Sequence, residues 1–512
     1  MLEKHAARAP NSSTIENAIR WLKQRETGGF WRIPVISSCL ESTLQSLTVV
    51  EDARKRERIF DYLLENEFWK KILVAPPFFM KALEEDEILR KEVKEKLTTK
   101  TEDAFLRKSF AEKSKAERSL IRVYYLSLFK TSPKFTWSSR TSVFYDRLPH
   151  AAPYIYSKKA TEINRRLEEE LIRGMNKDGS YAGNTIQTIK SAYVLKKLGN
   201  EYYAKKAIRW LDKVYNNDGS FRPILYQDVY DTLWAALALS NLNENVESTL
   251  TWLDSVRVEV GYPYYSFSYY PDPDDTSLAL LLRKTLGLIE KRDDASIEFL
   301  LKSQNPDGGW SFLPFSYLSF YSFLRVLKPL LQIVGANERA RKANPHVLTM
   351  WQRTFQSTVD MTSRVINTLV CFREKLNIRH ALFKGIRFLT SRYSEGSFHT
   401  PLRWLDSDAY ENSLALIALH RMGINCEKIL KVQELNAPLE RVENVSHRLW
   451  SLLEFGASKK HCKKYIDFIE AKQSNDGSWK AETPFFSGSA RFCSQVFSTS
   501  FSLFVLSLAS KN

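Results

Sequence analysis

The sequence predicts an all-α protein in which pairs of helices are arranged as α/α barrels. A short turn followed by an aromatic residue recurs along the chain, with an amphipathic helical pattern before each copy and a more apolar one after it. Alternating patterns typical of strands are almost absent. Such helix pairs stack either into an open solenoid or into a closed ring.

The recurring turn combines an acidic residue or glycine, a glycine and an aromatic residue. Glycine readily takes positive φ in such a turn, and the aromatic ring is then free to pack back on the preceding helix. Three copies have glutamine upstream, at Gln24, Gln304 and Gln473. The copies are Gly28-Gly29-Phe30-Trp31, Asp178-Gly179-Ser180-Tyr181, Asp218-Gly219-Ser220-Phe221, Asp307-Gly308-Gly309-Trp310, Glu395-Gly396-Ser397-Phe398 and Asp476-Gly477-Ser478-Trp479.

The helices fall into two sets that predict an inner and an outer ring. The amphipathic set has apolar residues at i, i+3 and i+4, which favours one buried face. It comprises 18–24, 207–215, 295–304, 385–393 and 465–473. The more apolar set comprises 228–242, 272–286, 360–372, 409–423, 444–456 and 495–509. Six inner helices after about residue 205 favour a closed barrel over a solenoid.

The first 200 residues are less regular. Three segments, 38–47, 117–129 and 185–199, have the character of inner helices and predict a second, reduced barrel. Between them lie a charged helical stretch at 81–100 and a loop-rich stretch at 130–154.

Composition limits the partners and the compartment. The chain carries 75 Lys and Arg against 59 Asp and Glu, a net charge of +16, which favours an anionic substrate, membrane surface or nucleic acid. The basic residues are dispersed, so nucleic acid is not expected.

The start shows no apolar secretory segment, the apolar stretch at 278–289 is broken by Arg283 and Lys284, and the five cysteines form no CxxC pair. These features predict a cytoplasmic protein, with peripheral membrane association left open.

One acidic motif carries chemistry. Asp272, Asp274 and Asp275 lie within four residues, followed by Thr276, at the start of a predicted inner helix. Asp is favoured at helix starts, so one interpretation of the motif is a cluster of residues that cap the helix N-terminus. In an apolar site, desolvation and mutual repulsion would instead keep one carboxyl protonated and able to donate a proton. The dense aromatic run at 262–270 favours the second interpretation, because ring faces stabilise cations.

These motifs resemble a known family. Asp272-Pro273-Asp274-Asp275 resembles the DxDD motif of class II terpene cyclases, and the recurring turn resembles their QW repeat. The resemblance to squalene-hopene cyclases and bacterial diterpene cyclases runs along most of the chain. It implies a larger C-terminal α6-α6 barrel, which the family calls the β domain (206–512, joined by the helix within 1–20), and a reduced γ barrel (21–205).

The resemblance also implies roles for individual residues. Asp274 would be the general acid that protonates an alkene or epoxide, with Asp272 and Asp275 holding and polarising it. Supporting polar residues would be Asp231, Thr276 and Arg364. The aromatic residues expected to line the site and stabilise cations are Trp69, Tyr230, Tyr264, Tyr270, Phe312, Trp404, Tyr410, Phe492 and Phe497.

Arg364 departs from the family pattern, which often has histidine there. A permanent cation beside Asp274 would lower the pKa of that carboxyl. We therefore expect Arg364 to point elsewhere, to pair with Asp272 or Asp275, or to serve a diphosphate. If it silenced the acid, the barrel would be a binding protein without catalysis.

The length resembles that of bacterial cyclases that convert geranylgeranyl diphosphate to a bicyclic diphosphate, an intramolecular isomerisation. The resemblance implies Mg²⁺ and no organic cofactor. The acidic run Glu84, Glu85 and Asp86 is the nearest candidate metal site, although it reads equally as a solvated helix face. Candidate diphosphate contacts, each also explained as a surface cation, are Lys70, Lys71, Arg222 and Arg403.

Alternative functions remain at this stage. A squalene-type cyclase and a C15 farnesyl diphosphate cyclase share the acid mechanism. A zinc-dependent barrel would need Asp, Cys and His ligands together, and His461-Cys462 is the one adjacent pair. The sequence leaves monomer and homodimer both open.

Overall fold

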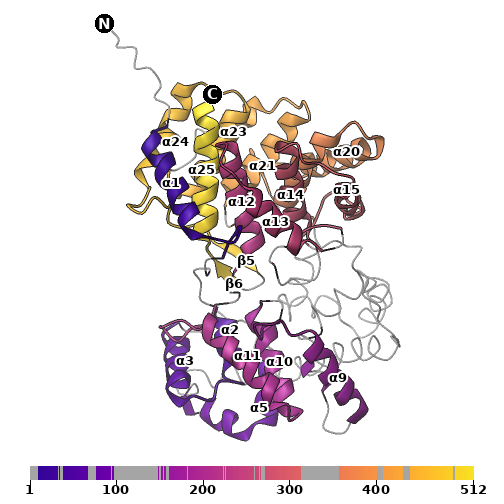
Figure 1. The fold of residues 1–512 in the computed structure, drawn as a ribbon, viewed down its shortest axis with the longest axis vertical. Coiled ribbons are helices and arrows are strands. Elements are labelled where there is room, and N and C mark those ends of the chain that lie inside the picture. Colours follow the sequence, from indigo (N-terminus) through magenta and orange to yellow (C-terminus); the bar gives the residue numbers. More distant parts are fainter. Residues whose placement is uncertain are drawn as a thin grey trace.

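A computed structural model describes residues 10–66, 77–96, 148, 152–156, 161–312, 357–430 and 439–511, with short gaps inside these ranges. Two lobes are visible (Figure 1). The larger lobe contains the C-terminal helices together with the first helix of the chain, and the smaller lobe contains the other helices before residue 215.

Six inner helices of the larger lobe form a closed ring, as predicted. Each packs against the next in chain order, and the last packs against the first, so the ring closes between α25 and α12. Closure gives every inner helix a neighbour on both sides and explains why all six are so apolar. They are α12 (Asp228–Asn241), α14 (Pro273–Thr285), α19 (Val359–Leu369, continued by the 3₁₀ turn Val370–Phe372), α21 (Asp408–Arg421), α23 (Val442–Glu454) and α25 (Gln495–Lys511).

Outer helices pack against this ring. Within the described residues they are α1 (Ser12–Arg25), α13 (Glu247–Val256), α15 (Asp293–Lys302), α20 (Leu376–Ser391) and α24 (Lys459–Ala471). Helix α1 packs on α25, and its Trp21 indole donates a hydrogen bond of 3.0 Å to Asp476. The amide of Gln473 donates to the carbonyl of Thr14 at 2.9 Å. The first described helix and the last helix therefore lie in the same lobe.

The recurring turns join neighbouring outer helices. The indole of Trp479 donates to the carbonyl of Ile469 at 2.6 Å, so the ring packs back on the preceding helix, as expected. Gly477 has φ of +90°, and a Cβ there would lie 2.4 Å from the backbone oxygen of Asn17 on α1. Gly308 approaches Lys384 on α20 in the same way. Glycine is thus required both by its conformation and by the contact.

Strands within the described residues are limited to three short hairpins, so the wall of the barrel is helical. They pair β1 (Glu26–Thr27) with β2 (Phe30–Trp31), β3 (Tyr393–Ser394) with β4 (Ser397–Phe398), and β5 (Phe485–Ser487) with β6 (Ala490–Phe492). The third hairpin leads directly into α25 (Figure 1).

The smaller lobe has a hydrophobic core of its own, built around residues such as Phe60, Phe79 and Trp210. Its described helices are α2 (Leu40–Ser46), α3 (Ala53–Glu65), α5 (Pro77–Glu85), α9 (Thr161–Arg173), α10 (Thr185–Lys197) and α11 (Glu201–Val214). The predicted segments 38–47 and 185–199 correspond to α2 and α10, whereas 117–129 lies outside the described residues. The domain boundaries at 20 and 205 stay predictions.

Candidate active site

The acidic motif begins α14, and the structure unites its two interpretations. Asp272 is the N-cap, and its Oδ1 accepts hydrogen bonds from the backbone N–H groups of Asp274 at 2.8 Å and Asp275 at 3.0 Å. Pro273 occupies the first turn, where its missing N–H costs nothing. All three aspartates are 2% exposed or less. The motif is therefore both a helix cap and a buried acidic cluster.

Burial and mutual repulsion favour the protonated forms of this cluster. Burial, reinforced by the charge of Asp274, raises the pKa of Asp272 to about 7. The pKa of Asp275 is raised well above its usual value, first by burial and then by the charges of Asp272 and Asp274. Asp275 thus binds its proton more tightly than Asp272 does. The backbone N–H groups that donate to Asp272 favour the ionised form of that side chain.

Arg364 lies against Asp274 itself. Its Nε is 2.8 Å from Asp274 Oδ1, and both groups are buried. The geometry between these two atoms is not that of a hydrogen bond, so the contact is a close ion pair. The guanidinium also donates to the hydroxyl oxygens of Tyr410 at 3.0 Å and Tyr230 at 3.5 Å. The structure pairs Arg364 with the middle aspartate, so the expectations that it points elsewhere or pairs with Asp272 or Asp275 are wrong. The expectation that it serves a diphosphate stays a prediction.

The net effect on Asp274 is the reverse of the one that the arginine alone would produce. Burial raises the pKa of Asp274 and is the largest influence, Arg364 lowers it, and the nearby Asp360 raises it again. The pKa lies above the ordinary value for aspartate. Asp274 therefore keeps the property that a proton donor needs, although a cation touches it.

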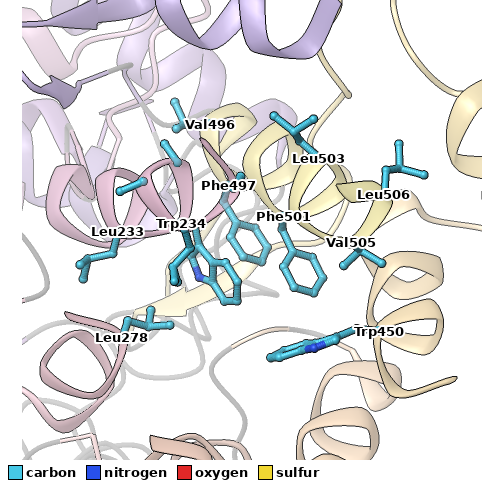
Figure 2. Close-up of a cluster of buried hydrophobic side chains, with 14 of the residues drawn as sticks. Leu233, Trp234, Leu278, Trp450, Val496, Phe497, Phe501, Leu503, Val505 and Leu506 are labelled. Atoms are coloured by element: carbon cyan, nitrogen blue, oxygen red, sulfur yellow. The ribbon is translucent and has the colours of Figure 1, made fainter. Parts of the chain in front are cut away.

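An aromatic cluster surrounds the ion pair. Its members come from four inner helices and the third hairpin, and all are buried. Phe497 and Phe501 stack at 5.5 Å, and the edge of Trp234 meets Phe501 at 4.9 Å (Figure 2). The guanidinium carbon of Arg364 lies 5.0 Å from the centre of the Trp234 ring. The cluster comprises Tyr230, Trp234, Tyr410, Trp450, Phe485, Phe497 and Phe501.

The sequence predicted three of the seven members of this cluster and missed the other four. Tyr230, Tyr410 and Phe497 each occupy the third position of an inner helix. Trp234 and Phe501 lie one turn further on, four residues after Tyr230 and Phe497. The i+4 spacing was the signal that could have identified them, since such residues share one face of a helix.

His447 is a further buried group that the sequence did not reveal. It is the sixth residue of α23, and its ring lies 4.1 Å from Phe501 and 4.9 Å from Tyr410. Burial, with the charge of Arg364, holds the pKa of this imidazole well below its usual range. The side chain is therefore neutral. No local pattern marks it, because an isolated histidine on an apolar helix has no characteristic spacing.

The supporting residues are placed differently from the aromatic cluster. Asp231 accepts hydrogen bonds from the Ser494 hydroxyl at 2.8 and 2.7 Å and from Gln227 at 2.9 Å, and burial raises its pKa to about 8. The hydroxyl of Thr276 accepts from the backbone N–H of Tyr262 at 3.0 Å. Both side chains hold segments onto inner helices. Phe312 is partly buried and packs against the neighbouring core cluster.

Several predicted residues cannot be placed. Trp69, Tyr264, Tyr270 and Trp404 lie outside the described residues, as do Lys70, Lys71 and Arg403. For Phe492 the structure describes the backbone pairing with Phe485. Arg222 donates to the carbonyl of Lys213 at 3.2 Å.

The candidate metal residues make protein contacts. Glu85 accepts a hydrogen bond from the Tyr193 hydroxyl at 2.7 Å, and Asp86 accepts one from the backbone N–H of Leu89 at 2.9 Å. Across the described part of the chain, no three His, Cys, Asp or Glu side chains are grouped so as to hold a metal ion. Glu84, Glu85 and Asp86 therefore form no preassembled group of three ligands, and a Mg²⁺ site at these residues stays a prediction. His461 and Cys462 likewise belong to no such group.

None of the described helices combines the length and the apolar character that crossing a bilayer requires.

A closed ring of six inner helices, with outer helices packed on it and a buried acidic cluster at the start of one inner helix, defines an α/α toroid. The family model for the prenyltransferase alpha-alpha toroid domain matches residues 184–316 and 276–478, more than half of the chain. The chain belongs to this family.

Solved structures extend the likeness to the whole chain. The ent-copalyl diphosphate synthase from Streptomyces platensis is 11% identical in sequence and has a TM-score of 0.51. The match covers 98% of this chain and 100% of the synthase chain. The resemblance to class II terpene cyclases is thereby confirmed at the level of the fold.

Two further structures match less well. The type II terpene cyclase MstE from Scytonema is 16% identical, with 57% of this chain and 90% of that chain covered and a TM-score of 0.43. Abietadiene synthase from Abies grandis is 12% identical, with 97% of this chain and 58% of that chain covered and a TM-score of 0.37. No curated protein sequence matches the chain significantly.

Proposed function

We propose that this protein is a class II terpene cyclase, which starts cyclisation by protonating an alkene of a linear isoprenoid. The observation that carries the proposal is Asp274, a buried carboxyl with a raised pKa that touches Arg364 beside the aromatic cluster. A carboxylic acid kept protonated near neutral pH is the group that such chemistry requires. The family and the shared fold agree with it.

The reaction would begin at the Asp274 carboxyl. Its O–H bond breaks, the terminal C=C bond supplies the electron pair of a new C–H bond, and the neighbouring carbon becomes a cation. The resulting Asp274 carboxylate is stabilised by Arg364 at 2.8 Å. Ring closure moves the positive charge along the substrate, next to the faces of residues such as Trp234 and Phe501. Loss of a proton ends the sequence, and the product is an isomer of the substrate.

We propose geranylgeranyl diphosphate as the substrate and a bicyclic terpenyl diphosphate as the product. The net charge of +16 supports an anionic substrate, and the full-length match to a copalyl diphosphate synthase supports this chain length. Farnesyl diphosphate and squalene are the competing substrates. Mg²⁺ would bind the diphosphate of such a substrate, with Glu84, Glu85 and Asp86 as its candidate protein ligands.

The test is to incubate the purified protein with farnesyl diphosphate, geranylgeranyl diphosphate and squalene, each with Mg²⁺ and with EDTA. Products are treated with phosphatase and identified by gas chromatography and mass spectrometry. We expect a cyclic alcohol from geranylgeranyl diphosphate after phosphatase treatment, since the diphosphate stays on the product. Asp274→Asn should lower the rate by about a hundredfold to ten-thousandfold, because general acid catalysis contributes 10²–10⁴-fold and asparagine has no acidic proton.

Asp294→Asn is the matched control. Asp294 makes an exposed ion pair with Lys375 at 2.6 Å, so its loss should leave the rate unchanged. A folded Asp274→Asn variant with wild-type activity would contradict the mechanism. Cyclic product from squalene alone would instead move the protein to the triterpene cyclases.

A further inference from the structure

His447 is a buried ionisable side chain that the proposed initiation step does not use. It is fully buried, and neither ring nitrogen has a hydrogen-bond partner among the described residues. A neutral imidazole has one donor and one acceptor, and leaving such groups unpaired in a protein interior costs about 1–3 kcal/mol. This arrangement indicates a group that meets a partner absent from the protein itself.

The position of His447 links it to the acid. Its ring lies 4.9 Å from that of Tyr410, whose hydroxyl accepts a hydrogen bond from Arg364 at 3.0 Å. Arg364 in turn contacts Asp274. The imidazole also packs at 4.1 Å against Phe501, a member of the aromatic cluster. The acid and the histidine therefore border the same cluster and are separated by Arg364 and Tyr410.

The protonation state suits a proton acceptor. Burial and the charge of Arg364 keep the imidazole neutral, so one nitrogen has a free lone pair at neutral pH. Lowering the pKa of an imidazole makes it a weaker base. A proton on a carbon adjacent to a carbocation is far more acidic than an imidazolium, however, so a weak base suffices. The neighbouring hydroxyl of Tyr410 has its pKa raised by burial and is not ionised.

We propose that His447 ends the cyclisation by taking a proton from the carbon next to the final cation, directly or through one water molecule. This role rests on the proposed function. The C–H bond breaks, its electron pair becomes the new C=C bond, and the proton binds the imidazole nitrogen. The imidazolium, 0% exposed and close to the charge of Arg364, is unstable and gives its proton to water when the product leaves, while the Asp274 carboxylate takes a proton from water. Protons taken and released then balance over one turnover.

The experiment compares His447→Phe and His447→Gln with the wild-type protein, on the substrate that the wild type cyclises in the experiment above. Phenylalanine keeps a flat ring against Phe501 and removes both nitrogens, whereas glutamine keeps a polar group. His420→Gln is the control, because the His420 ring also lies against a phenylalanine, Phe455 at 4.3 Å, but at an exposed end of α21. Products, turnover and melting temperature are measured for each.

We expect His447→Phe to lower the share of the wild-type alkene in the product roughly tenfold, with double-bond isomers or an alcohol in its place, because general base catalysis has at least this effect. Its melting temperature should stay the same or rise, since no hydrogen bond is lost. A purely structural histidine would give the opposite result, a lower melting temperature with unchanged products.

Unchanged product ratios in both folded variants would overturn the role of His447 and leave the proposed function intact. The absence of any cyclic product from the wild-type protein would remove the proposed function and this role together. If His447→Phe fails to fold, the product ratio of His447→Gln decides between the outcomes.

Discussion

At the scale of single residues, the contact between Asp274 and Arg364 defines the site. In a buried pair of this kind, removal of one partner is strongly destabilising, because it leaves an uncompensated buried charge. Here burial raises the pKa of Asp274, and Arg364 has the hydroxyl oxygens of Tyr410 and Tyr230 and the face of Trp234 as further partners. The arginine is therefore held in place whether or not the acid is ionised.

This arrangement predicts the behaviour of Arg364→Met. Arg364 lowers the pKa of Asp274, so its removal should raise that pKa further. Activity requires the protonated acid and falls as pH rises through its pKa, so the alkaline limb of the pH–rate profile should move to higher pH. The maximal rate should fall roughly ten- to a hundredfold, because the carboxylate formed on proton transfer loses its counter-ion.

The measurement is the rate against pH for the wild type and Arg364→Met, with Arg379→Met as the control for loss of an exposed arginine. A profile that does not move, or moves toward lower pH, would contradict the assigned contact.

At the scale of elements, the recurring turn is a connector between outer helices. Glycines of several turns lie against the backbone of another helix: Gly29 against Ser248 of α13, Gly219 against Arg58 of α3, and Gly477 against Asn17 of α1. The aromatic residue that follows anchors the turn to the helix before it. The repeat thus fixes the spacing of consecutive helix pairs.

Gly477→Ala should be more destabilising than Gly423→Ala. Both glycines have positive φ, +90° and +82°, so both substitutions carry a similar backbone cost. A Cβ at 477 would lie 2.4 Å from Asn17 O, whereas at 423 it would meet nothing within 4 Å. Overpacking typically adds about 1–3 kcal/mol to the loss in free energy of unfolding. Denaturant unfolding of the two variants measures the difference, and equal losses would show that the contact is unimportant.

At the scale of the whole molecule, the larger lobe carries several buried carboxyls that bind protons more tightly in the folded state. The pKa of Asp231 is raised to about 8, that of Asp272 to about 7, and that of Glu443 is also raised by burial. In the unfolded chain such groups ionise near pH 4. Between these values the folded state binds more protons than the unfolded state, so stability decreases as pH rises.

We therefore expect the free energy of unfolding to fall from pH 5 to pH 8, by up to about 1.4 kcal/mol per pH unit for each such group. Asp231→Asn should remove one group's share of this slope, because asparagine does not titrate. Asp212→Asn, at an exposed ion pair with Lys55, should leave the slope unchanged. Denaturant unfolding at pH 5.5, 6.5 and 7.5 measures all three, and parallel curves for wild type and Asp231→Asn would contradict the prediction.

The sequence by itself determined the helical rings, the recurring turn and the acidic motif at the start of α14. These follow from local rules, since helical periodicity, the conformation of glycine and N-cap preference act over a few residues. The six apolar segments predicted as inner helices coincide with the six that form the ring. Part of the aromatic cluster could be predicted from the sequence for the same reason, because the i+4 spacing places Trp234 on the same helix face as Tyr230.

The tertiary structure alone decided which side chains meet. Arg364 contacts Asp274 from another helix, and it reaches Tyr230 across 134 positions of sequence. His447 meets Phe501 and Tyr410 from a third helix. Such contacts depend on the rotation and register of helices around the closed ring, which the packing of the whole barrel sets and no local pattern encodes. The direction of the Asp274 pKa shift follows from the same packing, because burial outweighs the charge of Arg364 only once the ring has closed.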